Sequence, residues 1–212
     1  MSPAVGVLGG AFNPPHLGHL LLASEAIDSL GLDELILVPT GVAPHKRIDP
    51  EPGPQLRLEL ARAAAAGVER VHTSDVEVRR EGPSFAYRTL ELLADELPGS
   101  DLTFVMGADV AAGLEGWRRP DRVLELARIA VAERPGARRA DVDQVLARLG
   151  VDDRADVVEM PPVGISSSLV RERVAAGRSI RWLVPDPVVD LIAEHRLYAV
   201  GAHAGAGGAV PR

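Results

Sequence analysis

Two glycines and two histidines near the amino terminus have the types and spacing of a phosphate site. Gly9 and Gly10 end an apolar run typical of a strand, and His16 and His19 open an apolar helical pattern. Positions three apart share one face of a helix, so both imidazoles can donate to the same anion. Glycines allow a close backbone approach, and the N–H groups of a helix N-terminus favour negative charge. We therefore expect phosphate chemistry at the end of the first strand.

A second group with the residue types of an anion site lies near residue 170. Ser166 and Ser167 precede a helical pattern, where serine is a preferred N-cap, and Arg171 follows within about one turn. Hydroxyl groups, free backbone N–H groups and a guanidinium can together bind an anion. Taken alone, these residues favour an ordinary capped helix with a solvated arginine.

The loop of residues 41–55 contains four prolines, two glycines and Lys46, the only lysine of the chain. A stretch of this length without secondary structure is typical of a functional lid or of a disordered segment. Because the chain uses arginine everywhere else, we expect Lys46 to contact a substrate. The alternative is a single leftover surface lysine.

The composition indicates one α/β domain with a sizeable core. The chain has 212 residues, 46% hydrophobic content and a net charge of −7, which is a poor match to nucleic acid. The absence of cysteine excludes disulfides, thiolate metal sites and cysteine nucleophiles. No apolar run approaches ~18 residues and no leader pattern opens the chain, so we expect a cytoplasmic protein without a membrane segment.

Short apolar runs alternate with helical patterns, which predicts a Rossmann-like, doubly wound parallel sheet with a small helical C-terminal subdomain. The expected strands are 4–8, 35–39, 70–77, 102–106, 129–133 and 156–160. The expected helices are 16–30, 54–66, 84–96, 109–115, 120–127, 139–149, 167–176 and 185–194. We expect one domain over 1–200, with the core sheet in 1–160, the helical part in 161–200 and a disordered tail over 201–212. Trp182 is expected to pack rather than bind a ligand.

Two of these segments resemble the signatures of the nucleotidylyltransferase superfamily. His16 to His19 reads His-x-Gly-His, and Ile165 to Arg171 is similar to Ile-Ser-Ser-Thr-x-Ile-Arg, with Ser168 in place of Thr and Val170 in place of Ile. The resemblance implies ATP binding on a Rossmann-like fold, with Gly18 leaving room for the nucleotide. The implied ATP-binding residues are Gly9, Gly10, Ala11, Phe12, His16, Gly18, His19, Gly107, Asp109, Ile165, Ser166, Ser167 and Arg171.

Further segments are similar to nicotinate-nucleotide adenylyltransferases. Residues 43–46 resemble their Pro-Pro-His-Lys segment, with Ala43 in place of the first proline, residues 107–117 their Gly-x-Asp…Trp pattern, and residues 134–136 their Arg-Pro-Gly. The resemblance implies that Asp109 serves the nucleotide and that Trp117 stacks on a pyridine ring. From the residues alone, Asp109 can equally cap a helix and Trp117 can equally pack in a core.

The resemblance weakens where those enzymes recognise the nicotinate end of their substrate. Phe85 and Ala86 replace a tyrosine and a threonine, so a hydroxyl donor is lost while backbone N–H groups remain. Arg88 lies close by and can pair with a carboxylate or be solvated. The implied acceptor-binding residues are Asn13, His45, Lys46, Phe85, Ala86, Arg88, Asp109, Trp117 and Arg134.

The resemblance implies an enzyme that joins nicotinate mononucleotide to the AMP part of ATP, with Mg²⁺ arriving on ATP. The implied catalytic residues are His16, His19, Lys46 and Arg171. Alternatives keep the reaction but use nicotinamide mononucleotide or pantetheine phosphate as acceptor. Two others are a nucleotide-binding regulator that has lost the transfer step, and a zinc protein that uses His16, His19 and His45.

Overall fold

The computed structural model describes residues 2–44, 48–132, 143–144, 147–148, 150 and 155–199. Its strands form one six-stranded sheet in the order β3-β2-β1-β4-β5-β6, with every neighbouring pair parallel. The strands are β1 (Ala4–Gly10), β2 (Glu34–Pro39), β3 (Val71–Thr73), β4 (Asp101–Gly107), β5 (Arg128–Ala132) and β6 (Ala155–Val158). The helices are α1 (Leu17–Leu30), α2 (Pro54–Ala65), α3 (Ala86–Glu96), α4 (Ala108–Ala111), the 3-10 helix η1 (Leu114–Gly116), α5 (Pro120–Leu126), α7 (Ser167–Ala175) and α8 (Asp186–Glu194).

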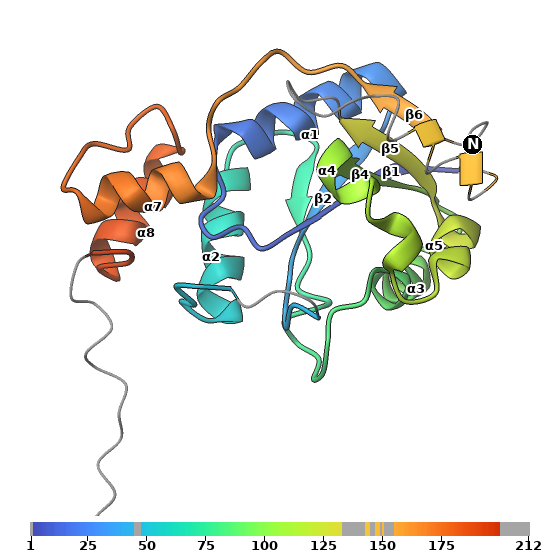
Figure 1. Ribbon diagram of the computed structural model, residues 1–212, viewed down its shortest axis with the longest axis horizontal. Coiled ribbons are helices and arrows are strands. Elements are labelled where there is room, and N and C mark those ends of the chain that lie inside the picture. Colours follow the sequence, from blue (N-terminus) through green and yellow to red (C-terminus); the bar gives the residue numbers. More distant parts are fainter. Residues whose placement is uncertain are drawn as a thin grey trace, which may run out of the picture.

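Alternation along the strands gives the sheet two apolar faces, each covered by helices (Figure 1). In β2, Ile36 and Val38 join the cluster that includes α3 and α5, whereas Leu35 and Leu37 join the cluster that includes α1 and α2. Successive side chains of a strand point to opposite faces, so a strand buried on both faces must be apolar throughout. The predicted Rossmann-like, doubly wound fold is confirmed.

The strand order reverses between β1 and β4, which lie side by side at the centre of the sheet. From β1 the chain moves outward through β2 to β3, and from β4 it moves outward the other way through β5 to β6. The loops that leave two such strands diverge and open a crevice beyond their carboxyl ends, where ligands of these sheets bind. Gly9 and Gly10 end β1 as part of the strand, and Gly107 ends β4, so both glycine ends face one crevice.

The C-terminal helices form a small subdomain beside α2, at one end of the molecule (Figure 1). Val170, Val188 and Ile192 of these helices pack with Leu60 and Ala64 of α2 in one apolar cluster. The backbone N–H of Leu17 also donates to the carbonyl oxygen of Leu183 at 2.9 Å, which ties the subdomain to the start of α1.

Three expectations about local structure are wrong. The strand expected over 70–77 stops at Thr73, because Arg79 N–H donates to Asp75 and the chain turns away from the sheet. The helix expected over 109–115 is split into α4 and η1. Trp182 is 80% exposed rather than packed, since it occupies a left-handed backbone position (φ 66°) in the turn from Ile180 to Leu183. The expected tail over 201–212 and most of the helix expected over 139–149 lie outside the described residues.

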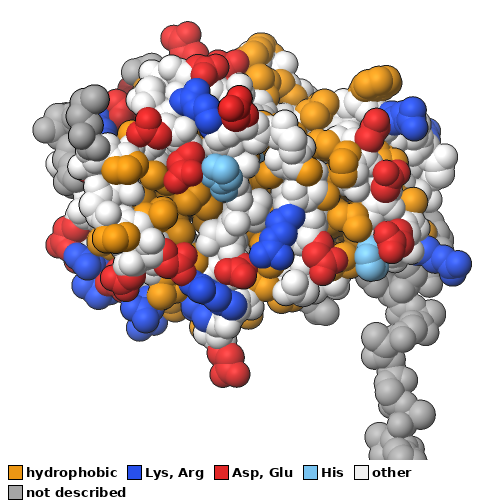
Figure 2. Space-filling view, turned by 180° about the vertical axis from the view of Figure 1, so that it is seen from behind, with side chains coloured by type: hydrophobic (Ala, Val, Ile, Leu, Met, Phe, Trp, Pro, Cys, Tyr) orange, Lys and Arg blue, Asp and Glu red, His pale blue; other side chains and the backbone are white. Residues whose placement is uncertain are grey.

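Within the described ranges, no helix has the length and apolar character needed to cross a membrane. Figure 2 shows the face behind that of Figure 1, where arginine side chains are scattered among aspartate and glutamate side chains. Some charged side chains of the protein are paired, for example Arg128 with Asp156 at 3.0 Å and Arg122 with Glu125 at 2.8 Å.

Tyr198, after α8, anchors the C-terminal subdomain to the segment before α1. Its buried hydroxyl donates to Asn13 Oδ1 at 2.6 Å, and Asn13 is itself only 4% exposed. Burial raises the pKa of this hydroxyl above its ordinary value, against the opposing effect of the Arg171 and Arg57 charges. The neutral hydroxyl is therefore the form that the folded protein favours.

Replacement of Tyr198 by phenylalanine should lower the free energy of unfolding by about 1–2 kcal/mol at neutral pH, because the buried side-chain oxygen Oδ1 of Asn13 loses its donor. Wild-type stability should also fall as the pH rises above about 10, where the unfolded tyrosine ionises and the folded one does not. That decline should be smaller in Tyr198→Phe. Urea denaturation at neutral pH and at pH 9–11 measures both effects, and identical curves for the two proteins would contradict the role of this hydroxyl.

Candidate active site

A cavity of about 390 Å³ lies at the switch point of the sheet. Its walls come from the end of β1, the end of β4, the turn into α3 and the segment after η1. Of the residues expected from the sequence, it is lined by Gly9, Gly10, His19, Phe85, Ala86, Gly107, Asp109 and Trp117. Residues that lie more than 100 positions apart in the chain thus meet around one volume.

The two histidines occupy different positions at the start of α1. His16 is the N-cap and is 5% exposed, whereas His19 is the third helical residue and lines the cavity. Their rings lie 3.8 Å apart between centroids, and Phe12, which is buried, packs edge-on against His19 at 5.1 Å. His16 and Phe12 therefore support His19 from behind the cavity wall.

A backbone contact sets the chemistry of the His19 ring. The N–H of His16 donates to Nδ1 of His19 at 3.1 Å, so Nδ1 acts as an acceptor. A neutral imidazole that accepts at one nitrogen carries its proton on the other. His19 thus presents Nε2–H as its donor, the form suited to a phosphoryl oxygen.

Gly18 is confined by protein rather than by open space. A Cβ atom at this position would lie 3.0 Å from Nδ1 and 3.1 Å from Cε1 of His16, and 3.6 Å from Cγ1 of Val163. The missing side chain therefore makes room first for the His16 ring. The implied role in leaving space for a nucleotide stays a prediction.

The start of α7 packs against the chain that leads into α1. The Ser166 hydroxyl caps α7 by accepting from Leu169 N–H at 3.1 Å, and the Ser167 hydroxyl donates to the Pro14 carbonyl at 2.8 Å. Arg171 donates to the Asn13 carbonyl at 2.8 Å. Arg171 thus contacts the residue that stands three positions before His16 in the chain. The lining of the described cavity does not include Ile165, Ser166, Ser167 or Arg171.

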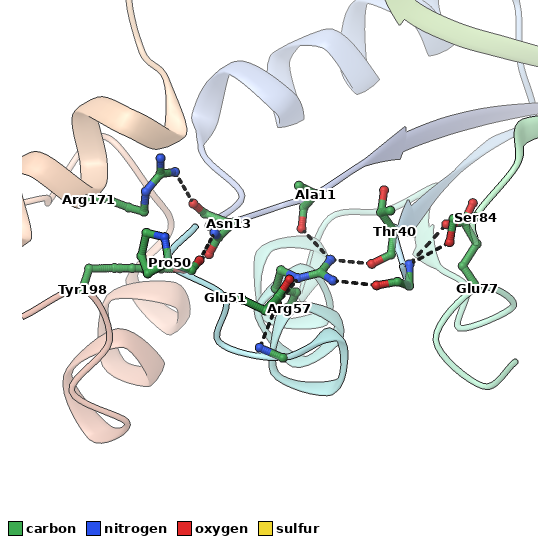
Figure 3. A network of polar contacts seen from close by, with 12 residues as sticks. Ala11, Asn13, Thr40, Pro50, Glu51, Arg57, Glu77, Ser84, Arg171 and Tyr198 are labelled. Atoms are coloured by element: carbon green, nitrogen blue, oxygen red, sulfur yellow. Dashed lines mark hydrogen bonds and ion pairs between the residues drawn. The ribbon is translucent and has the colours of Figure 1, made fainter. Parts of the chain in front are cut away.

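Asn13, which the sequence analysis expects to bind the acceptor, joins three parts of the chain (Figure 3). Its side chain donates to the Pro50 carbonyl at 2.7 Å and accepts from Tyr198, while its backbone carbonyl accepts from Arg171. Ala11 likewise uses its carbonyl within the protein, as the acceptor of a hydrogen bond from Arg57 at 3.1 Å. These contacts fix the path of the chain between the end of β1 and the start of α1.

The far side of the cavity is aromatic. Trp117 is partly buried and meets the Phe104 ring edge-on at 5.9 Å between centroids, and it still lines the cavity. Asp109 is exposed at the second position of α4, whose N-cap is Gly107, so its side chain does not cap that helix. Asp109 and Trp117 both line the cavity, where each could contact a bound ligand.

Arg88 lies on the exposed side of α3 and is not among the residues that line the cavity. It donates to Glu91 at 3.1 Å, and hydrogen bonds from Arg122 and Arg88 lower the pKa of that carboxyl below its ordinary value. The structure therefore does not bring Arg88 together with the other expected acceptor residues. His45, Lys46 and Arg134 lie outside the described residues.

Arg57 is the main residue that the sequence analysis missed as part of the site. Its side chain is fully buried, donates to the carbonyls of Ala11, Thr40 and Gly41 at 3.1, 2.5 and 3.0 Å, and pairs with Glu51 at 3.0 Å (Figure 3). The ends of β1 and β2 are thereby held together. The sequence signal for Arg57 is weak, because it is one arginine in the first turn of a predicted helix.

Glu77 is a second residue that the sequence analysis missed. It is 7% exposed, lines the cavity, and accepts from the Thr89 hydroxyl at 2.6 Å and from Gly41 N–H at 3.2 Å. A Cβ atom on Gly41 would lie 2.3 Å from the Glu77 carbonyl oxygen, so only glycine fits there. This cluster joins the β2 loop to α3, which carries the Phe85–Ala86 turn.

A doubly wound sheet with a histidine donor and a ligand-sized cavity at its switch point is typical of nucleotide-binding proteins. Residues 7–173 match the sequence model of the cytidylyltransferase-like family. The chain is 37% identical to a probable nicotinate-nucleotide adenylyltransferase of Rubrobacter xylanophilus, over 93% of each chain. It is 41% identical to one of Roseiflexus sp., over 93% of this chain and 98% of that one. The chain belongs to the nicotinate-nucleotide adenylyltransferase family.

The fold is also similar to that of a solved structure, the Plasmodium falciparum nicotinic acid mononucleotide adenylyltransferase complexed with NaAD. The TM-score is 0.72 over 92% of this chain and 97% of the other, at 16% sequence identity. At this identity the similarity establishes the fold.

Arg57→Ala should lower the free energy of unfolding by about 3 kcal/mol or more, because three carbonyls and one carboxylate lose a buried charged donor. Urea denaturation measures this change. Arg62→Ala is the matched control, since Arg62 lies on the same helix with its side chain 52% exposed. Equal effects of the two substitutions would refute the role of Arg57.

Proposed function

We propose that this protein transfers the AMP part of ATP to nicotinate mononucleotide, forming deamido-NAD and pyrophosphate in NAD biosynthesis. The observation that carries the proposal is the meeting of the glycine end of β1, His19, Asp109 and Trp117 around one cavity at the switch point. Membership of the family supports the choice of acceptor.

The chemistry requires positioning more than a protein nucleophile. A phosphate oxygen of the mononucleotide attacks the α-phosphorus of ATP, and the bond from that phosphorus to the bridging oxygen breaks as pyrophosphate leaves with the electron pair. Negative charge grows on the oxygens of the five-coordinate phosphorus. Nε2–H of His19 is a donor preset for such an oxygen, and donors fixed in advance stabilise the transition state without reorganisation.

Positive charge at the start of α1 would offset the charge on the triphosphate. Arg171 uses one N–H on Asn13 and another on Ser168, and a guanidinium has five in all. Its remaining donors suit the departing pyrophosphate. His16 supports His19, and by resemblance Lys46, His45 and Arg134 would contact the phosphates of the two substrates.

Enzymes of this family use a divalent metal with ATP, and we propose Mg²⁺ as that ion. No group of three or more His, Asp or Glu residues able to hold a metal occurs among the residues that the structure describes. The ion would arrive as part of the substrate, Mg²⁺-ATP, whose own phosphate oxygens supply ligands. On the acceptor side, the Trp117 ring would stack on the pyridine and Asp109 would accept from ribose hydroxyls.

The test of this function is a comparison of acceptors. Purified protein with Mg²⁺-ATP should release pyrophosphate with nicotinate mononucleotide, more slowly with nicotinamide mononucleotide, and least with pantetheine phosphate. Faster turnover of the amide would assign a different acceptor. ATP binding in calorimetry without pyrophosphate release from any acceptor would instead indicate a regulator that has lost the transfer step.

His19→Ala should lower kcat by roughly 10²-fold or more, because the transition state loses a fixed donor. His195→Ala is the control for the loss of an imidazole, because His195 is exposed at the end of α8, and it should leave kcat unchanged. Steady-state pyrophosphate release measures both variants. An unchanged kcat in His19→Ala would remove His19 from the mechanism.

A further inference from the structure

The charges on the cavity wall raise a problem for an acceptor that carries a carboxylate. Glu77 and Asp109 both line the cavity, and both are acidic. A further negative charge beside them is unfavourable unless a cation offsets it. Arg118 is the only arginine among the described residues that line this cavity.

Arg118 lies between the two features that border the expected pyridine position. It follows Trp117 directly in the chain, and its guanidinium carbon lies 5.1 Å from the centroid of the Phe85 ring. Phe85 is the residue before α3, which begins at Ala86. The cation–π contact holds the guanidinium over the turn where the expected hydroxyl donor is replaced by Ala86.

Two neighbouring arginines differ from Arg118 in where they point. Arg88 pairs with Glu91, and the guanidinium carbon of Arg119 lies 5.3 Å from the centroid of the Tyr87 ring. Neither lines the cavity. Of these three arginines, only Arg118 lines the cavity.

We propose that Arg118 is a specificity-determining residue that recognises the carboxylate on the pyridine ring of the acceptor. This inference rests on the proposed function. A guanidinium offers two parallel N–H donors that match a carboxylate, and it is always charged. A carboxamide has no charge to pair with it. Arg118 thus takes over a discrimination that the Ala86 side chain cannot make, and Arg88 is not required.

The test uses Arg118→Gln, which removes the charge, and Arg118→Lys, which keeps the charge without the fork. The kcat/KM for nicotinate mononucleotide divided by that for nicotinamide mononucleotide should fall by roughly tenfold in Arg118→Gln and by less in Arg118→Lys. Arg88→Gln and Arg119→Gln are matched controls that should leave this ratio unchanged. Calorimetric binding of the two mononucleotides without ATP gives the same comparison in the absence of turnover.

Each other outcome overturns the assignment in its own way. Equal losses with both acceptors would mean that Arg118 binds their common phosphate. An unchanged ratio would assign carboxylate recognition to the first backbone N–H groups of α3. Absence of transfer by the wild type would refute the proposed function, whereas the binding ratio would still test Arg118. If neither mononucleotide binds the wild type, both proposals fail.

Discussion

The buried guanidinium of Arg57 is the interaction on which the site depends. It collects the carbonyls of Ala11, Thr40 and Gly41, which lie just beyond the ends of two adjacent strands. Peptide carbonyls that turn inward at the end of a sheet lose their ladder partners and are costly to bury without donors. A single charged donor resolves this for two loops at once, and Glu51 compensates its charge. The cavity can therefore open at the switch point without the loops collapsing into it.

The same principle extends from Arg57 to the C-terminal subdomain. Glu51 and Pro50 belong to one short stretch, and Pro50 accepts from Asn13, which also accepts from Tyr198 and Arg171. Successive hydrogen bonds thus join the stretch before α2, the chain before α1 and the C-terminal subdomain (Figure 3). Distant parts of the chain therefore position the segment that leads into α1.

The sequence predicted the sheet well because its signals are local. Strands buried on both faces must be apolar, and their apolar runs can be read directly from the sequence. It predicted Gly9, His19, Asp109 and Trp117 at the cavity for the same reason, since each lies at the end of an element. Asn13 and Arg88 show the limit. Whether a polar side chain faces a ligand or a protein partner depends on contacts such as those with Tyr198 and Glu91, which spacing does not reveal. Arg57, Glu77 and Arg118 were missed for that reason.

An acidic protein that binds anionic nucleotides must concentrate positive charge where they bind. Exposed arginines elsewhere already face carboxylates, as Arg148 faces Glu115 and Arg122 faces Glu91 and Glu125. Such surface pairs add little stability, but they cancel much of the field that each guanidinium would project. The potential at the cavity is then set by nearby donors: Nε2–H of His19, Arg171 and Arg118. Because these lie on two sides of the switch point, one side suits a triphosphate and the other suits a smaller anion on an aromatic ring.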